Sequence, residues 1–438
     1  MRKLFEVAIV LTITGFSMNA MATQILRNGG TDLAANGAGD VVPEAPHVAE
    51  RHAKPWMHTE TRLRLFAPAW RDIGEQSPTE AAGRFEVLYG HLDPKPFHEA
   101  NPDVKMIKYL LGPYVNKREV ARLPSDAMGH NADGNIIKAR NFENWVVVPD
   151  NPHWIDYVVQ FAKNQFDLGY DGIFTDSMGT GPVGGNYLHS KPINPNTGQE
   201  YTKTEWMMAE SKMAQAIRQV IPEDMMLTMN GLARGTRYWA EPVESSPRVL
   251  LAHYDGAMSE QIWREPKSEL TSWPSLELWM SEIEMIKDVE KRGLMGFWWT
   301  KCWSNGNTSN DEPNADVLVP QWRRFALGSY LLAAGPNSYF NFDTKKKDQP
   351  KSNAAEYYVE YDAPLGVAIG SMDQFGGTKV YYRRFENGFV VVNPDGNAVN
   401  GVEIPGTDGK TFKSWGEDNS VIFPLDVKAH TGLILTRD

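Results

Sequence analysis

The stretch that decides the fold occurs twice in the chain. The two copies read Tyr170-Asp171-Gly172-Ile173-Phe174-Thr175-Asp176 and Tyr254-Asp255-Gly256-Ala257-Met258-Ser259-Glu260. Each runs Tyr-Asp-Gly, two apolar residues, a hydroxyl residue and a carboxylate, a pattern typical of a short buried strand. The last positions, 176 and 260, are 84 residues apart. If two strand–helix units separate the copies, each unit has about 42 residues, which suits a barrel of roughly 250 residues with insertions.

Alternation of strands and helices surrounds these two copies. We expect eight strands, at residues 63–69, 85–90, 105–111, 172–176, 225–230, 256–260, 293–299 and 337–342. Apolar residues at helical spacing predict a helix from Pro152 to Gly169, and Thr202 with Glu205 forms a possible capping box before another. Further helices are expected at 275–291 and 321–332. The predicted fold class is therefore α/β, a (β/α)8 TIM barrel over residues 51–350.

The last 75 or so residues have no helical period. Short alternating runs at 380–385, 389–392, 401–404, 421–423 and 433–436 are separated by turn residues. Asn387-Gly388 lies between two of them and indicates a hairpin. We expect a small C-terminal antiparallel domain, β-sandwich-like, over residues 360–438.

The N-terminal segment has the composition of a secretory signal peptide. Arg2 and Lys3 precede an apolar run at 7–16, and Ala20-Met21-Ala22 follows it. We therefore expect residues 1–22 to be a cleaved signal, 23–50 to be a linker and the protein to be secreted or periplasmic. No other run approaches the roughly 18 apolar residues of a membrane helix, so no membrane association is expected after signal removal.

Composition excludes several classes of protein. A net charge of −11 argues against a nucleic-acid partner, and a single cysteine in 438 residues excludes a disulfide framework. Neither the H-E-x-x-H nor the G-x-S-x-G motif is present. Gly179, Gly181 and Gly184 have dinucleotide-loop spacing, but nearby prolines oppose the helix that such a site needs. We expect no cofactor and no metal, although the polar loop at 305–316 leaves calcium open.

The two repeated strands end in carboxylates that would lie at the same end of the barrel. Side chains alternate along a strand, so Gly172, Phe174 and Asp176 share one face, as do Gly256 and Glu260 at the second copy. If these faces point inward, both carboxylates lie at the C-terminal mouth, where barrel enzymes carry their active sites. Two carboxylates in one cleft are what cleavage of a glycosidic bond requires. The alternative is that each caps a helix or pairs with an arginine.

The two aspartates at the strand entrances belong to the opposite end of the barrel. Asp171 and Asp255 each precede the glycine of their copy. Barrel enzymes carry their active sites at the mouth and not at that end, so we expect structural roles for the two aspartates.

The segment 169–176, together with 255–260, resembles a family of TIM-barrel glycoside hydrolases and, more distantly, the endo-α-1,4-polygalactosaminidases. The resemblance covers roughly residues 60–345, and the tail is similar to the accessory domain of such hydrolases. It implies catalysis by the carboxylates of the fourth and sixth strands. Asp176 would be the nucleophile or base and Glu260 the acid. The acidic run of chitinases and the Asn-Glu strand end of cellulase-like enzymes are absent, so neither substrate class can be assigned.

Further residues at the expected strand ends are candidates for substrate binding. They are Asn230, Trp298, Trp299, Trp263, Arg234, Lys301, His91 and Tyr114. Alternation prevents Trp298 and Trp299 from both facing the cleft. Arg234, Arg237 and Lys301 could receive a sulfate or carboxylate, although solvated loop charges are the simpler explanation.

The function expected from these features is hydrolysis of a poly- or oligosaccharide, which leaves open whether the substrate is anionic. Two alternatives survive. A polysaccharide lyase acting on an anionic glycan would use a Tyr, His or Lys base, and a non-catalytic barrel would only bind glycans on its aromatic side chains.

Overall fold

The computed structural model describes residues 54–437, apart from 71, 185–186, 305–308, 349–353, 408 and 418. The predicted signal peptide and linker lie outside these residues. Within the described part, none of the helices combines the length and the apolar character needed to cross a bilayer.

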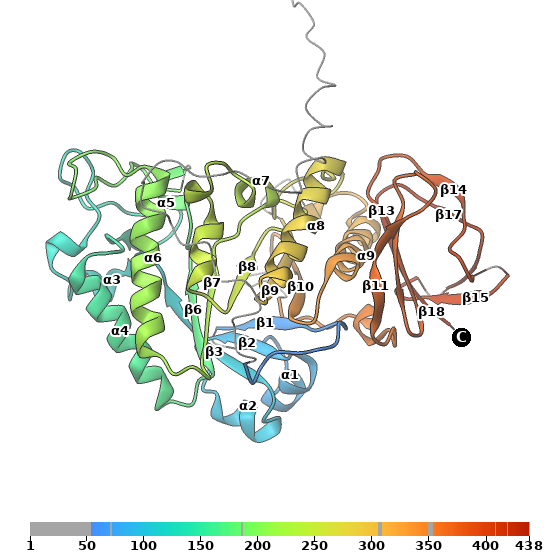
Figure 1. Ribbon diagram of the computed structural model, residues 1–438, viewed down its shortest axis with the longest axis horizontal. Helices are drawn as coiled ribbons and strands as arrows, with labels where there is room; N and C mark the ends of the chain where they lie inside the picture. Colours follow the sequence, from blue (N-terminus) through green and yellow to red (C-terminus); the bar gives the residue numbers. More distant parts are fainter. Residues whose placement is uncertain are drawn as a thin grey trace, which may run out of the picture. The chain divides into compact units, whose positions relative to one another are not determined.

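Eight parallel strands form a closed barrel, which confirms the predicted fold (Figure 1). In order around the barrel they are β1 (Phe66–Ala69), β2 (Val87–Gly90), β3 (Lys105–Leu111), β6 (Gly172–Asp176), β7 (Met226–Asn230), β8 (Gly256–Ser259), β9 (Met295–Trp303) and β10 (Ser338–Lys345). The Phe340 amide donates to the Arg64 carbonyl over 2.9 Å, and Leu65 pairs with Phe340 in parallel. This contact joins the last strand to the first.

Helices follow the strands and cover the outside of the barrel. They are α1 (Pro78–Arg84), α2 (Lys95–Ala100), α4 (Pro152–Phe166), α6 (Lys203–Val220), α8 (Leu276–Lys291) and α9 (Ala315–Ala333), with one-turn helices α3 (Lys117–Val120), α5 (Gly181–Gly184) and α7 (Gly235–Tyr238) in the connections. The predicted capping box is confirmed, because Thr202 Oγ1 accepts from the Glu205 amide and Glu205 accepts in return from the Thr202 amide. Such a cap stabilises a helix by about 1 kcal/mol.

The longest connections between barrel strands lie at the mouth. Between β3 and β6 the chain inserts a two-stranded ribbon, β4 (Tyr114–Asn116) and β5 (Asn144–Val146). No long helix separates β7 from β8; a 3₁₀ turn at Pro247–Ala252 stands there instead. These insertions add residues to the barrel mouth that the strands themselves do not provide.

The barrel interior explains the glycine of the repeated stretch. Phe174, Met226 and Met258 pack there with other large side chains. A Cβ on Gly172 would lie 2.4 Å from the Met226 carbonyl oxygen, and one on Gly256 would lie 2.8 Å from Met295 Cβ. Both glycines therefore leave room for side chains of the next strand.

The carboxylates at the strand entrances are structural, as expected. Asp171 Oδ2 accepts from the Met106 amide over 2.7 Å and lies 2.9 Å from His98 Nε2. Asp255 Oδ2 accepts from Arg218 over 2.6 Å and from the Leu227 amide over 2.9 Å. Each aspartate thus ties its own strand to the preceding one.

The C-terminal strands form antiparallel sheets. The larger has the order β11 (Ala368–Gln374), β12 (Tyr381–Phe385), β13 (Gly388–Asn393), β18 (Thr431–Arg437), β15 (Thr411–Ser414) and β16 (Asn419–Ile422), and β14 (Val399–Val402) pairs with β17 (Leu425–Val427). The predicted hairpin is confirmed between β12 and β13, where Phe385 pairs with Gly388 across Glu386-Asn387.

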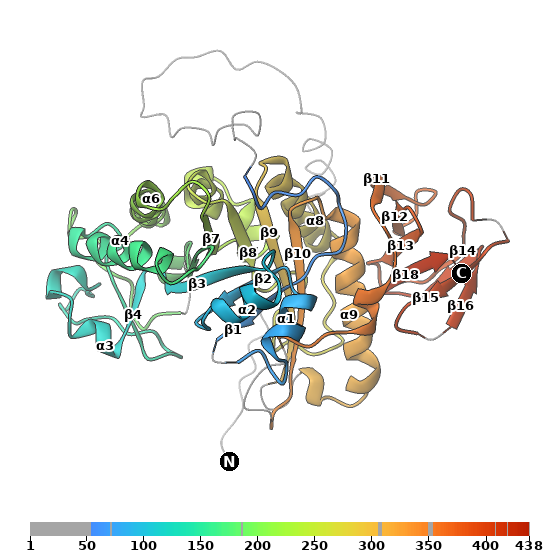
Figure 2. The same ribbon diagram turned by 90° about the horizontal axis from the view of Figure 1, so that it is seen from below.

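Helix α9 contacts both the barrel and the larger C-terminal sheet (Figure 2). A Cβ on Gly432 would lie 2.2 Å from the Arg324 carbonyl oxygen, so β18 approaches the helix backbone closely. Nearby, Trp273 is stacked between Trp322, with ring centroids 3.8 Å apart, and His430, at 4.8 Å.

Candidate active site

The inward faces of neighbouring strands bring the two predicted carboxylates to the mouth. Asp176 and Asn230 are the last residues of β6 and β7, and Glu260 is the first residue after β8. All three continue the alternation that places Phe174, Met226 and Met258 in the barrel interior.

One amide group contacts both carboxylates. Asn230 Nδ2 donates to Asp176 Oδ1 and to Glu260 Oε2, each over 2.8 Å. The two oxygens are therefore no more than twice 2.8 Å apart. Because both amide hydrogens are used, only Asn230 Oδ1 could meet a sugar hydroxyl.

Asp176 is held by a second donor. Tyr109 Oη, from the inward face of β3, donates to Asp176 Oδ2 over 2.6 Å. Burial, and then the neighbouring charge of Glu260, raise the pKa of Asp176 above its ordinary value. The hydrogen bonds from Tyr109 and Asn230 oppose that increase because they favour the ionised form.

Glu260 is paired with a cation. Lys301, on β9, contacts Glu260 Oε1 through its ammonium group. The same nitrogen lies 3.9 Å from the ring centroid of Trp299 and 4.4 Å from that of Trp303. The lysine side chain is only 4% exposed, whereas that of Glu260 is 37% exposed. Glu260 therefore has access to solvent that its partner lacks.

A cavity of about 900 Å³ opens over the carboxylate pair. This volume is at the upper end of the roughly 300–1,000 Å³ of small-molecule sites. Aromatic side chains line much of it: Trp70, Tyr109, Tyr114, Phe142, Tyr187, Trp299 and Trp303. Phe142 stacks on Tyr187 with ring centroids 6.0 Å apart. Such faces are suited to the apolar faces of sugar rings.

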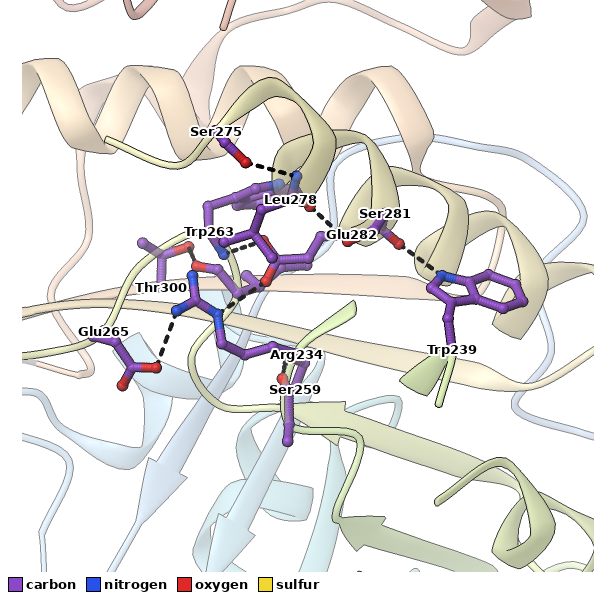
Figure 3. A network of polar contacts seen from close by, with 12 residues as sticks. Arg234, Trp239, Ser259, Trp263, Glu265, Ser275, Leu278, Ser281, Glu282 and Thr300 are labelled. Atoms are coloured by element: carbon purple, nitrogen blue, oxygen red, sulfur yellow. Dashed lines mark hydrogen bonds and ion pairs between the residues drawn. The ribbon is translucent and has the colours of Figure 1, made fainter. Parts of the chain in front are cut away.

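A polar network fixes the loops that follow β7 and β8 (Figure 3). Arg234 pairs with Glu265, which lines the cavity, over 3.0 Å and with Glu282 of α8 over 3.2 Å. The fully buried Glu282 also accepts from the Trp263 amide over 2.7 Å. Burial raises the pKa of Glu282 to about 7, although the Arg234 charge opposes this. Ser259 also donates to the Ala233 carbonyl and joins the end of β8 to the loop after β7.

Six of the ten predicted site residues line the cavity: Asp176, Glu260, Asn230, Trp299, Lys301 and Tyr114. The carboxylates are brought together as expected. The roles of Asn230 and Lys301 differ from the expectation, because both contact the carboxylates.

Four predicted binding residues do not line the cavity, and this corrects the expectation for them. Trp298 points to the outer side of the sheet, where it is buried and donates to Ser338 Oγ. Trp263 is also buried, has a positive φ of 60° and donates its backbone amide to Glu282.

The other two of these four residues contact neighbours of the cavity instead. The Arg234 guanidinium is occupied by Glu265 and Glu282. The His91 ring packs against Trp70 and Tyr109, with centroids 5.7 and 5.4 Å away.

Sequence reasoning missed several residues that line the cavity. Tyr109 shares a strand face with the buried Ile107, so alternation alone could have identified it. Trp70 follows β1 and could have been found in the same way. Phe142 and Tyr187 lie in irregular segments with no period, and no signal in the sequence marks them.

No group of three or more potential metal ligands occurs among the residues for which coordinates are described. Part of the 305–316 loop lies outside those residues.

Comparison with known proteins gives a family match and distant structural similarities. The model of the hypothetical glycosyl hydrolase family 15 matches residues 121–389, more than half of the chain. No curated protein matches. The chain is similar to the glycoside hydrolase domain of PelA from Pseudomonas aeruginosa, with 12% identity, a TM-score of 0.39, and 67% of this chain and 96% of that one covered.

Two further structures show similarity of the same order. Aspergillus fumigatus Ega3 in complex with galactosamine has 11% identity and a TM-score of 0.41, with 68% of this chain and 96% of that one covered. A β-L-arabinopyranosidase from Geobacillus stearothermophilus in complex with arabinose has 10% identity and a TM-score of 0.46, with coverage of 87% and 98%.

The barrel and the family match together support hydrolysis of glycans in general. The match covers the strands that carry Asp176, Asn230 and Glu260. The chain belongs to the hypothetical glycosyl hydrolase family 15.

Proposed function

We propose that the protein cleaves glycosidic bonds of a poly- or oligosaccharide with Asp176 and Glu260, and that the anomeric configuration is retained. The observation that carries this proposal is the shared contact of both carboxylates with Asn230 Nδ2 at 2.8 Å. Retaining enzymes have carboxyl groups about 5–5.5 Å apart, whereas inverting enzymes need about 6.5–9.5 Å to admit a water molecule. The facing oxygens of the two carboxylates lie within twice 2.8 Å of each other, which supports retention.

The surroundings of the two carboxylates support different roles. Tyr109 and Asn230 fix both oxygens of Asp176, as a nucleophile requires. Glu260 is more open to solvent, from which an acid/base group must exchange its proton. We therefore assign Asp176 as the nucleophile and Glu260 as the acid/base.

The reaction then has two steps. Asp176 attacks the anomeric carbon while the glycosidic C–O bond breaks and Glu260 gives its proton to the departing oxygen. In the second step, water loses a proton to Glu260 and attacks the same carbon, which breaks the ester to Asp176. Both groups return to their starting states, and no other reactant is needed.

Release of reducing ends from a panel of neutral, amino-sugar, uronic and sulfated polysaccharides tests this function. Wild type should cut at least one member, and the Asp176→Asn and Glu260→Gln variants should lose about 10²–10⁴-fold in rate while staying folded. Equal rates in wild type and both variants would overturn the assignment of the site. Products that absorb as unsaturated uronates would instead support a lyase, and binding without cleavage would support a glycan-binding barrel.

Retention has its own test. Proton NMR of the first product formed from a defined oligosaccharide should show the anomer of the substrate. The opposite anomer would rule out Asp176 as nucleophile but leave hydrolysis intact.

We further propose that the enzyme acts outside the cytoplasm, on the strength of the predicted signal at residues 1–22. Expression of the full chain in a bacterial host should yield a periplasmic or secreted form shortened at its N-terminus, which mass spectrometry detects. An uncleaved cytoplasmic product would contradict this location.

A further inference from the structure

Charge is distributed unevenly around the cavity. Among the described residues that line it, all cations come from β9 or from the loops after β7 and β8: Arg237, Lys267 and Lys301. The lining residues from β1, β3, β6 and their loops include one charged group, Asp176. All the cations that line the cavity therefore lie on one side, the cationic side, which also carries Trp299 and Trp303, whereas the opposite side is aromatic and has Asp176 as its one charged group.

The carboxylates of the cationic side already have partners. Glu260 pairs with Lys301, and Glu265 pairs with Arg234 over 3.0 Å. Arg237 and Lys267 are exposed, and neither forms an ion pair with any residue that the structure describes. Two positive charges therefore remain for a ligand beside the carboxylate pair.

The opposite side presents rings instead of charges. Phe142 is 54% exposed and Trp70 is 38% exposed, the two most exposed aromatic side chains of the described chain. Trp70 packs edge-on against Tyr109, which donates to Asp176, with ring centroids 4.6 Å apart. A saccharide that crosses the pair would meet aromatic faces on one side and cations on the other.

We propose that Arg237 and Lys267 bind an anionic substituent, a carboxylate or a sulfate, so that the substrate is an acidic saccharide. This inference rests on the proposed function, because it places the substituent on a sugar bound beside Asp176 and Glu260. A guanidinium group binds either anion through two parallel hydrogen bonds, which a neutral hydroxyl does not match. The chain as a whole carries a charge of −11, so local cations are needed to hold an acidic polymer.

Matched pairs of oligosaccharides test the inference. The probes are oligogalacturonate with its methyl ester, and a sulfated galactan oligosaccharide with its desulfated form. Cleavage is measured with wild type, and binding is measured with the Asp176→Asn variant, so that the result does not depend on turnover. We expect at least one acidic member to be preferred by about 10-fold or more over its neutral partner. A preference within the oligogalacturonate pair would indicate that the site binds a carboxylate, and a preference within the galactan pair would indicate that it binds a sulfate.

Variants of the two cations then locate the preference. Arg237→Gln and Lys267→Gln should each reduce the acidic-to-neutral ratio about 3- to 10-fold. Lys291→Gln, which removes an exposed charge at the end of α8, is the matched control and should leave the ratio unchanged.

Two outcomes would overturn the inference. One is that no acidic member binds more tightly than its neutral partner; the other is an unchanged ratio in both variants. Failure of the proposed function is distinguishable, because in that case Asp176→Asn and Glu260→Gln would cut as well as wild type.

Discussion

The two ends of the barrel use the same repeated stretch for opposite purposes. At the entrances, Asp171 and Asp255 each accept a backbone amide of the neighbouring strand and lie beside a basic side chain. At the mouth, Asp176 and Glu260 share one amide donor. The entrance carboxylates accept from the backbone of the neighbouring strand and so join two strands, whereas the mouth carboxylates share a side-chain donor and line the cavity. The interaction partners of each carboxylate, and not its residue type, therefore distinguish the structural aspartates from the proposed catalytic pair.

Replacing one carboxylate at each end of the barrel gives the largest expected contrast between activity and stability. Asp176→Asn should lower kcat about 10²–10⁴-fold with little loss of thermal stability. Asp255→Asn should lower the free energy of unfolding by about 1.5–3 kcal/mol, because a charged hydrogen bond to Arg218 is weakened. Its kcat per folded molecule should match wild type. Denaturant melts and initial rates measure both effects, and a catalytic loss in Asp255→Asn would break the contrast.

The hydrogen bond from Tyr109 to Asp176 gives a smaller effect that depends on pH. This bond lowers the pKa of Asp176, so its removal in Tyr109→Phe should raise that pKa further. A nucleophile must be ionised, so the acidic limb of the kcat/KM profile should move to higher pH and the rate should fall several-fold on that limb.

Tyr157→Phe is the matched control for this measurement. Tyr157 donates to Glu119 over the same 2.6 Å, but neither residue lines the cavity. Its profile should follow that of wild type. If the acidic limb of the kcat/KM profile does not move in either variant, Asp176 is not the group whose titration this limb reports.

The last comparison concerns two buried glutamates of α8, one in its first half and one close to its C-terminal end. Burial raises the pKa of both Glu282, near the mouth, and Glu290, near the entrances, to about 7. The folded state thus holds protons that the unfolded state loses near pH 4.5, so stability should fall as pH rises from about 4.5 to 7. Glu282→Gln and Glu290→Gln should each flatten this dependence, by at most about 1.4 kcal/mol per pH unit.

Activity separates the two glutamates. Glu282 anchors the loops after β7 and β8, so Glu282→Gln should also reduce kcat/KM. Glu290 accepts from Ser338 at the start of β10, and Glu290→Gln should leave kcat/KM unchanged. Equal activities of both variants, measured at pH 6 and 8, would show that the network in Figure 3 does not position the site.

The barrel and the placement of Asp176 and Glu260 at its mouth could be predicted from the sequence, because strand alternation continues without interruption from the interior to the mouth. Phe174 and Asp176 lie on one face for the same reason that Met258 and Glu260 do. The same rule, applied to β3, leads to Tyr109.

Residues beyond the strand ends were not predictable in this way. Ala233 and Trp263 have positive φ values, 56° and 60°, although neither is a glycine. These turns direct Arg234 and Trp263 towards Glu282 instead of the cavity. Phe142 reaches the cavity from an irregular loop, whose course depends on tertiary contacts and not on any period.

The position of α9 between the barrel and the C-terminal sheet limits where the gene can be truncated or recombined. One side of this helix contacts β9 and β10, and the other contacts β13 and β18 with almost no space at Gly432. A shortened gene that ended before β11 would leave Phe325 and Gly328 of α9, which are buried, without part of their cover. Helix α9 therefore packs the last strands against the barrel, so that the two form one folded unit. Recombination between relatives should preserve this packing when the whole segment from α9 to β18 is exchanged together.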